Sequence, residues 1–270
     1  MTKKIFYSLS LSLLLYNCCC SGQAIALTDF KVADTPAINS AGWYRLNNSV
    51  GDAFAVSMDG GQLRIRRYKE DDVTGLDLPQ GRLLGVNYGE FGGGLYYKPA
   101  DSTRPFFVNG HRGGSSPTFF GGLMVPSTNP IVQRIKGFSL LANGQVVDIF
   151  KYKDSLFFIE GLAHMGLSFG ALYSLGLRND SFFITKTIAF DDAPQAVRAD
   201  GDRLWVATLQ GFYRIEDGQK SAIFGHLFWY ALYPNSIAVG PDGYIYVGHR
   251  GGYSRIDPVK KELVFYQYER

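Results

Sequence analysis

The feature that most constrains this chain is a repeat of about 40 residues in its C-terminal part. One copy contains the strand-like runs 203–207 (RLWVA) and 211–215 (GFYRI), and the next copy contains the matching runs 244–247 (YIYV) and 252–256 (GYSRI). An alternating run precedes each pair and begins in the second copy at Pro234. In both copies an Asp-Gly turn separates this alternating run from the first run of the pair. Each copy therefore predicts four short antiparallel strands joined by tight turns.

Looser copies of the repeat extend toward the N-terminus. The pair 156–159 and 170–175 matches the second and third strands of a copy, and the pair 83–86 and 93–97 gives a weaker trace. Residues 115–146 do not fit the repeat. Four strands in about 40 residues are typical of one blade of a β-propeller. The sequence thus predicts an all-β propeller, with six four-stranded blades as the first expectation and five or seven as open alternatives.

A hairpin is predicted ahead of these copies, over residues 53–65. Its turn is expected at Asp59-Gly60-Gly61, because Asp-Gly dipeptides flanked by alternating runs are strong hairpin signals. Helical periodicity is weak throughout the chain after residue 26, so almost no helix is expected.

The first 26 residues are expected to be a cleaved secretory signal. Lys3 and Lys4 precede an apolar run, and residues 24–26 (AIA) have the small-x-small pattern of a cleavage site. The three cysteines, Cys18 to Cys20, fall inside this segment. We therefore expect residues 27–270 to form a single propeller domain without disulfides, in the periplasm or secreted. A lipid anchor on one of the cysteines is the alternative.

Charge and hydropathy narrow the range of partners. The chain has 27 basic and 24 acidic residues, two of the basic ones in the expected signal. Such a balanced charge argues against a nucleic-acid partner, which usually demands a basic face. The apolar run near the N-terminus is too short to span a bilayer, which needs about 20 apolar residues. No transmembrane segment is predicted, and a monomer is expected.

Residues 234–247 (PNSIAVGPDGYIYV) resemble the repeats of NHL-type, two-component-regulator-type and gluconolactonase-like propellers. This resemblance implies the blade fold. In the gluconolactonase-like enzymes it would also imply a metal held by an Asn after the Pro, an Asp in the next repeat and an early Glu. Asn235 matches that Asn, but the neighbouring copy has Gln195 and no matching early Glu is found. No metal and no cofactor are therefore expected.

The pentapeptide Gly-His-Arg-Gly-Gly occurs twice, at residues 110–114 and 248–252. His111 and Arg112, like His249 and Arg250, offer hydrogen-bond donors suited to an anionic or sugar ligand. The alternative interpretation is repeat ancestry, with His and Arg bonding backbone carbonyls in a turn.

A second motif, Gly166-Leu167-Ser168-Phe169-Gly170, has the G-x-S-x-G pattern of a hydrolase nucleophile elbow. That elbow requires a helix after the serine. Because residues 171–175 read as a strand, the match is interpreted as accidental.

Strand order predicts that the candidate site residues share one face of the disc. Turns between second and third strands, and loops between blades, leave a propeller on the same side. The residues expected to gather there, around the channel mouth, are Asn235, Glu90, Glu160, His111, Arg112, His164, His226, His249 and Arg250.

The functional prediction is an exported binding or interaction module for a small molecule, a glycan, a peptide or an envelope protein. The alternative is a propeller enzyme, a lactonase-like hydrolase or a lyase, acting at the channel mouth. Glu90 and Glu160 are the best acid candidates, each following a second-strand segment. No paired carboxylates can be assembled from equivalent repeat positions, so catalytic residues stay unassigned and the question of enzyme or binding module stays open.

Overall fold

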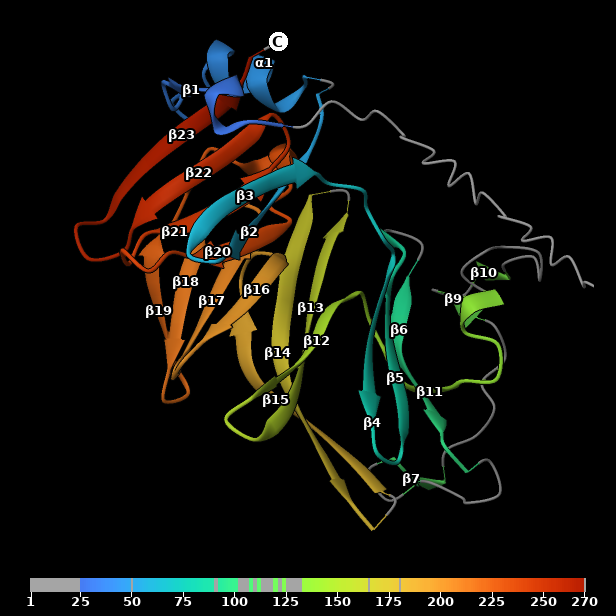
Figure 1. The fold of residues 1–270 in the computed structure, drawn as a ribbon. Coiled ribbons are helices and arrows are strands. Elements are labelled where there is room, and N and C mark those ends of the chain that lie inside the picture. The colour runs from blue at the N-terminus through green and yellow to red at the C-terminus, as the bar shows by residue number, and fades with distance from the viewer. Residues whose placement is uncertain are drawn as a thin grey trace, which may run out of the picture.

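The computed structural model describes residues 25–49, 51–89, 92–101, 133–164, 166–179 and 181–269, and four short strands between residues 107 and 124. Strands dominate these residues, and antiparallel sheets fan out side by side (Figure 1). The expected signal lies almost entirely outside the described residues, as do Cys18 to Cys20 and Glu90.

The last two sheets follow the sequence repeat. One contains β16 (Pro194–Asp200), β17 (Arg203–Thr208), β18 (Phe212–Glu216) and β19 (Gln219–Phe224), paired in chain order. The other contains β20 (Ser236–Val239), β21 (Ile245–His249), β22 (Gly252–Asp257) and β23 (Glu262–Tyr268). At its outer edge β1 (Phe30–Ala33) pairs antiparallel with β23. The four strands predicted for each of these copies are confirmed.

Two further sheets contain the looser copies. The first comprises β12 (Val146–Tyr152), β13 (Ser155–His164), β14 (Leu167–Arg178) and β15 (Ser181–Phe190), with β7 (Phe107–Val108) and β8 (His111–Arg112) added at the edge. The second comprises β4 (Val73–Leu78), β5 (Gly81–Asn87), β6 (Gly93–Pro99) and β11 (Ser139–Asn143). The part of the chain that could not be phased thus lies mostly between β6 and β11.

The predicted hairpin is present as β2 (Phe54–Asp59) and β3 (Gln62–Arg67). Its inner face packs against β20 and β22, where Phe54 and Val56 join Phe30, Ala238 and Tyr253 in one buried cluster. A separate short pair is formed by β9 (Phe119–Phe120) and β10 (Leu123–Met124).

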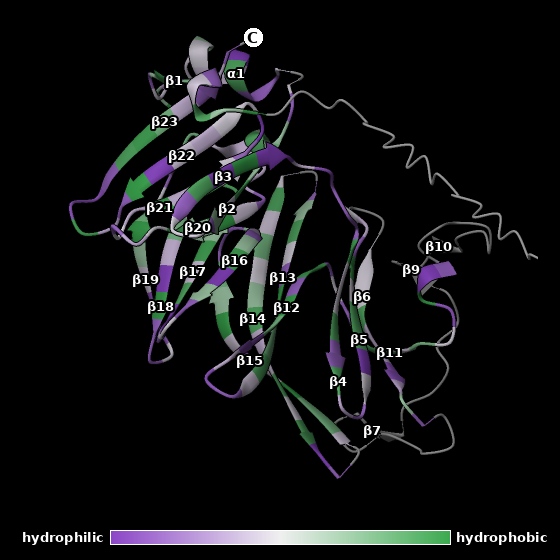
Figure 2. Ribbon diagram, viewed as in Figure 1, coloured by the Kyte–Doolittle hydropathy of each residue, from purple (hydrophilic) through white to green (hydrophobic). Residues whose placement is uncertain are grey.

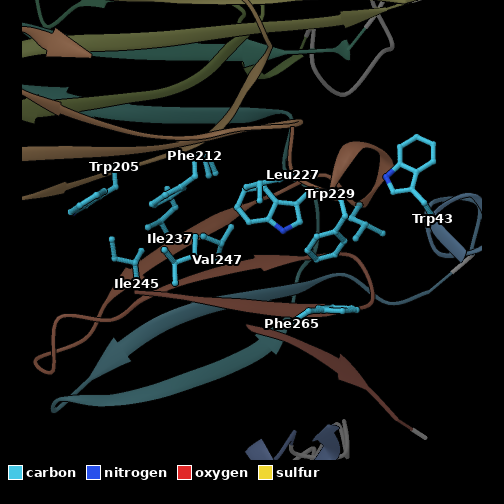
Figure 3. Close-up of a cluster of buried hydrophobic side chains, with 14 residues drawn as sticks. Trp43, Trp205, Phe212, Leu227, Trp229, Ile237, Ile245, Val247 and Phe265 are labelled. Atoms are coloured by element: carbon cyan, nitrogen blue, oxygen red, sulfur yellow. The ribbon is translucent and has the colours of Figure 1, made fainter. Parts of the chain in front are cut away.

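Buried clusters lie between successive sheets. Trp205, Phe212, Trp229 and Phe265 belong to the cluster between the last two sheets (Figure 3). Similar clusters join β12–β15 to each of its two neighbours. Figure 2 shows hydrophobic and hydrophilic residues mixed within single strands, as the period-2 alternation of strand side chains requires. Burial on both faces of each inner sheet is the packing expected of neighbouring propeller blades.

The described helices are few and short. They are η1 (Leu27–Asp29), α1 (Ala41–Asn47) and η3 (Tyr230–Leu232). The sequence pattern did not predict α1, which begins where the Ser40 hydroxyl accepts the Trp43 N–H at 3.1 Å. None of the described helices could cross a membrane.

The architecture is all-β and propeller-like, with several four-stranded antiparallel sheets. Among the described residues there are four sheets of four or more strands and the β2–β3 hairpin, besides the β9–β10 pair. The count of six blades stays a prediction.

Candidate ligand-binding pocket

A pocket of about 300 Å³ lies where the first strands of the sheets converge. The four larger sheets and the β2–β3 hairpin, five units in all, each contribute to its lining. The contributing residues are Ala53 before β2, Thr74 in β4, Val147 in β12, Gln195 in β16 and Asn235 before β20. A propeller places its channel mouth at this kind of convergence.

Irregular pairing accompanies two of the lining residues. The register of β12 with β13 shifts between Val146 and Asp148, and that of β16 with β17 shifts between Pro194 and Ala196. Val147 and Gln195 are therefore bulge residues, left out of the regular pairing. A β-bulge re-aims a side chain away from the alternation of its strand, and both residues line the pocket.

An acidic run forms part of the wall. Glu70, Asp71 and Asp72 lie in the loop between β3 and β4. Arg134 donates to Asp71 at 2.5 Å and lowers the pKa of that carboxyl. Burial, together with the neighbouring charge of Asp71, raises the pKa of Asp72. Asp72 therefore keeps its proton to a higher pH than an ordinary aspartate.

Arg250 is the single Lys or Arg residue in the described lining. Its guanidinium lies 5.2 Å from the centroid of the Tyr233 ring. Its backbone N–H donates to the Leu232 carbonyl at 2.7 Å, which fixes its position beside η3. The pocket thus offers a cationic group stacked on an exposed aromatic ring.

Asn235 leaves a hydrogen-bond donor unused in this pocket. Its backbone N–H donates to the Gly248 carbonyl at 2.9 Å, and its Oδ1 accepts from the Ser236 hydroxyl at 2.8 Å. Its Nδ2 is buried and has no partner among the described residues. An unsatisfied buried donor costs about 1–3 kcal/mol, so a shift of this side chain toward a ligand acceptor would be favoured.

Glu160 and His164 lie near the pocket without lining it. Glu160 pairs with Val146, the first residue of β12, which lines the pocket. Burial raises the pKa of Glu160, partly offset by a hydrogen bond from Tyr173. His164 ends β13 and lines a neighbouring hollow that shares Tyr233 with the pocket. Of the predicted ligand-binding residues whose side chains are described, the structure brings together Asn235 and Arg250.

The expectation that His249 reaches the channel mouth is wrong. Its side chain is fully buried against Phe228, Trp229 and Phe265. Its Nδ1 lies 2.9 Å from the Arg250 carbonyl and its Nε2 lies 3.0 Å from the Ser254 hydroxyl. Burial lowers the pKa of His249 to about 4. This copy of the pentapeptide therefore uses its histidine in the core.

The expected position of His111 and Arg112 is also wrong. Their strand β8 pairs with β7, which pairs with β15 at Ser181 and Phe182. That end of β15 adjoins the turn after Arg178, whereas His164 and Leu167 lie at the other end of β14. The two copies of the pentapeptide therefore do not share a face. The long-range parallel pairing of β7 with β15 has no local sequence signal.

Most of the pocket lining was not among the residues predicted from the sequence. The missed residues are Tyr68, Glu70, Asp71, Asp72, Thr74, Asn87, Val147 and Tyr233. One signal was available, because the acidic run connects one unit to the next just as Pro234 and Asn235 do. If the β2–β3 hairpin and the sheet that begins with β4 are aligned as successive repeats, the acidic run is predicted on the same face as Pro234 and Asn235.

The sheets and the converging pocket define an all-β, propeller-like protein. No family model matches the chain, and no curated protein sequence matches it. Solved structures align with it at low similarity. The tricorn protease is 12% identical with a TM-score of 0.37, over 80% of this chain and 26% of that chain. This chain thus spans about a quarter of the protease.

Two further solved structures align over most of both chains. A glucose dehydrogenase is 10% identical with a TM-score of 0.32, over 82% of this chain and 97% of that chain. A streptogramin B lyase is 13% identical with a TM-score of 0.30, over 82% and 95%. At this level of similarity the description of the fold rests on the sheets themselves.

Proposed function

We propose that the protein is an exported binding module whose pocket takes a small, hydroxyl-rich ligand such as a single sugar. The observation that carries this proposal is the unpartnered Nδ2 of Asn235 in a pocket built from all five units. Export rests on the signal pattern of the first 26 residues, and the expected location is the periplasm or the cell exterior.

The lining chemistry supports a sugar-like ligand. Asn87, Gln195 and Asn235 supply amide groups that can both donate and accept hydrogen bonds. Tyr68 and Tyr233 supply rings with polar tips. A volume of about 300 Å³ is at the lower end of ligand pockets, which suits a small ligand. A neutral polyol can use amides, carboxylates and a guanidinium together, since hydroxyls donate and accept.

A thermal-shift screen tests the proposal. The probes are neutral monosaccharides, sugar acids and amino acids at millimolar concentration. At least one sugar or sugar acid should raise the melting temperature, because a ligand at 100 times its Kd stabilises by about 2.7 kcal/mol. Arg250→Ala should weaken that response about tenfold, the effect of losing roughly 1.4 kcal/mol.

Arg255 provides the matched control. Its guanidinium also stacks on a tyrosine, 4.7 Å from the Tyr244 ring centroid, but it does not line the pocket. Arg255→Ala should leave the ligand response unchanged. A response confined to amino acids, or equal losses in the two arginine variants, would contradict the proposal.

An enzymatic role at the same pocket is the second candidate. The raised pKa of Asp72 is the observation that favours it, because a raised pKa brings a carboxyl group closer to the range suited to a general acid. Hydrolysis of aldonolactones above the buffer rate, abolished by Asp72→Asn, would support this candidate. If the native protein hydrolyses aldonolactones no faster than buffer alone, the enzymatic role is contradicted and the binding module stays as the proposed function.

A further inference from the structure

Two more hollows adjoin the pocket through shared lining residues. The second hollow, of about 330 Å³, shares Tyr233 with the pocket. The third, of about 550 Å³, shares Gln210, Tyr230 and Ala231 with the second. Each hollow therefore borders the next along shared side chains. We call the second and third hollows together the tyrosine groove.

Exposed aromatic rings follow one another along this path. Tyr233, Tyr230 and Tyr44 are 46%, 40% and 51% exposed, although large aromatic side chains tend to be buried. The Tyr230 ring centroid lies 5.5 Å from that of Trp43, which in turn lies 5.0 Å from that of Tyr44. Trp43 thus joins the rings of Tyr230 and Tyr44, and Tyr233 lines both the pocket and the second hollow.

A buried asparagine fixes two walls of the tyrosine groove, α1 and η3, relative to each other. Asn47, which is buried, donates through Nδ2 to the Trp43 and Phe228 carbonyls, both at 3.1 Å. Its Oδ1 accepts the Ala231 N–H at 2.8 Å. One side chain thus ties α1 to η3. A groove that is already formed binds without the cost of ordering its walls.

The backbone between the last two sheets is strained where it forms this wall. His226, Tyr230 and Tyr233 have φ angles of 56°, 34° and 49°, in the region that side chains with a Cβ rarely adopt. Three such residues within one short connection cost several kcal/mol by the usual figure of about 1–3 each. Strain of this kind clusters at ligand sites.

Trp43 places a buried hydrogen-bond donor beside the third hollow. It lines the third hollow and is only 7% exposed, yet its Nε1 has no hydrogen-bond partner among the described residues. Figure 3 shows its indole ring reaching from α1 to the edge of the buried cluster. A buried Trp N–H usually finds a partner.

The lining of the tyrosine groove carries no fixed charge. No Asp, Glu, Lys or Arg is among its described residues, and the titratable groups other than tyrosine are His164 and His226. Amides and a hydroxyl are present instead, from Asn39, Asn48, Gln210 and Ser168. A nucleic acid requires cationic groups for its phosphates, and the lining does not provide them.

We infer that the tyrosine groove binds a neutral, linear glycan whose terminal sugar occupies the pocket. Sugar rings present apolar C–H faces to aromatic rings and hydroxyls to amides, which is the chemistry of this lining. An extended peptide would instead favour an open strand edge, whereas η3, α1 and the β13–β14 turn form these walls. The inference rests on the proposed function, which places the terminal sugar of the glycan in the pocket.

Native gel electrophoresis in the presence of polysaccharides tests the inference. The gels contain hydroxyethyl cellulose, galactomannan, neutral arabinoxylan or soluble starch, with polygalacturonate as the charged comparison. At least one neutral polymer should retard the protein more strongly than polygalacturonate does. Tyr44→Ala and Tyr230→Ala should each weaken that retardation roughly threefold to tenfold, since an aromatic contact contributes about 0.5–1.5 kcal/mol beyond its buried area.

Phe183→Ala is the matched control. Phe183 is 46% exposed, as Tyr233 is, but it lies in β15 outside the groove. Circular dichroism and the melting temperature of each variant verify folding, and Tyr44 is exposed enough that its truncation should be tolerated. Trp43→Phe provides a second variant that removes the unpartnered N–H and keeps an aromatic ring.

The outcomes separate the two proposals. Retardation lost in Tyr44→Ala but kept in Arg250→Ala would support the groove and contradict the pocket. Binding of a monosaccharide with no gain in affinity for its oligomers would overturn the groove and leave the pocket. Lack of retardation in every neutral gel, equal loss in Phe183→Ala, or competition by casein peptides and not by oligosaccharides would also overturn the inference.

Discussion

The last two sheets differ at one equivalent position, the end of the second strand. Thr208 ends β17 and His249 ends β21, and both side chains are fully buried. Thr208 donates from its hydroxyl to the Gly211 carbonyl at 3.2 Å. His249 lies between the Arg250 carbonyl and the Ser254 hydroxyl. Both residues thus satisfy the turn between second and third strands.

The two sheets differ in that the residue at this position is titratable in one of them, as His249, and not in the other, as Thr208. Trp229 donates its Nε1–H to Ser254 Oγ at 3.1 Å, which leaves the hydroxyl proton of Ser254 for His249 Nε2. Neutral His249 then donates from Nδ1 to the Arg250 carbonyl. A second proton would take the acceptor away from the Ser254 hydroxyl proton and bury a positive charge in the core. A repeat position can thus keep its structural role while its chemistry gains pH sensitivity.

The largest expected effect is acid destabilisation through His249. Its pKa is about 4 in the fold against 6.5 ordinarily. Between these values the unfolded chain binds the proton and the fold does not, so stability falls as pH drops from about 6.5 to 4. The full loss is about 3 kcal/mol. Urea unfolding of the native protein and of His249→Gln over this pH range measures the loss. The variant is needed because carboxyl groups elsewhere make the stability of both proteins depend on pH. Identical pH slopes would contradict the assignment.

Ser254→Ala should cost about 2 kcal/mol at pH 7, because it leaves Trp229 Nε1 and His249 Nε2 buried without a partner. Urea unfolding measures the change. Ser174→Ala is the control, since the Ser174 hydroxyl makes a 3.5 Å contact with the Thr185 carbonyl near the surface. The control should stay within about 0.5 kcal/mol of the native protein. Equal effects would mean that the chain of donors from Trp229 to His249 adds nothing.

Thr208→Val gives the smallest expected effect, about 1 kcal/mol for the lost hydrogen bond. The loss should be the same at pH 5 and pH 7, because the β16–β19 sheet has no titratable group at this position. A loss that grows in acid would remove the contrast between the two sheets.

Local signals predicted the fold well. Alternating polarity and Asp-Gly turns predicted β16 to β23 because a strand and its turn are encoded by neighbouring residues. The rejection of the G-x-S-x-G motif agrees with the structure, where Ser168 lies in β14 and its hydroxyl bonds Asp192 at 2.5 Å. The helix α1 was missed because seven residues give too short a pattern.

The pocket was harder to predict, because its walls come from bulges and connecting loops. Gln195 and Val147 reach the pocket through register shifts, which alternation does not reveal. The burial of His249 depends on Trp229 and Phe265, which come from two other segments. A polar residue at a strand end was therefore assigned to the surface.

The pairing of β1 with β23 has a consequence for the order of folding. Phe30 lies opposite Tyr268, so residues from the two extremities of the described chain share one ladder. During synthesis β23 emerges more than 200 residues after β1, and β1 stays unpaired until then. Contacts between such distant positions close slowly. The sheet that contains β20 to β23 is therefore completed only after β23 has been made and has reached β1.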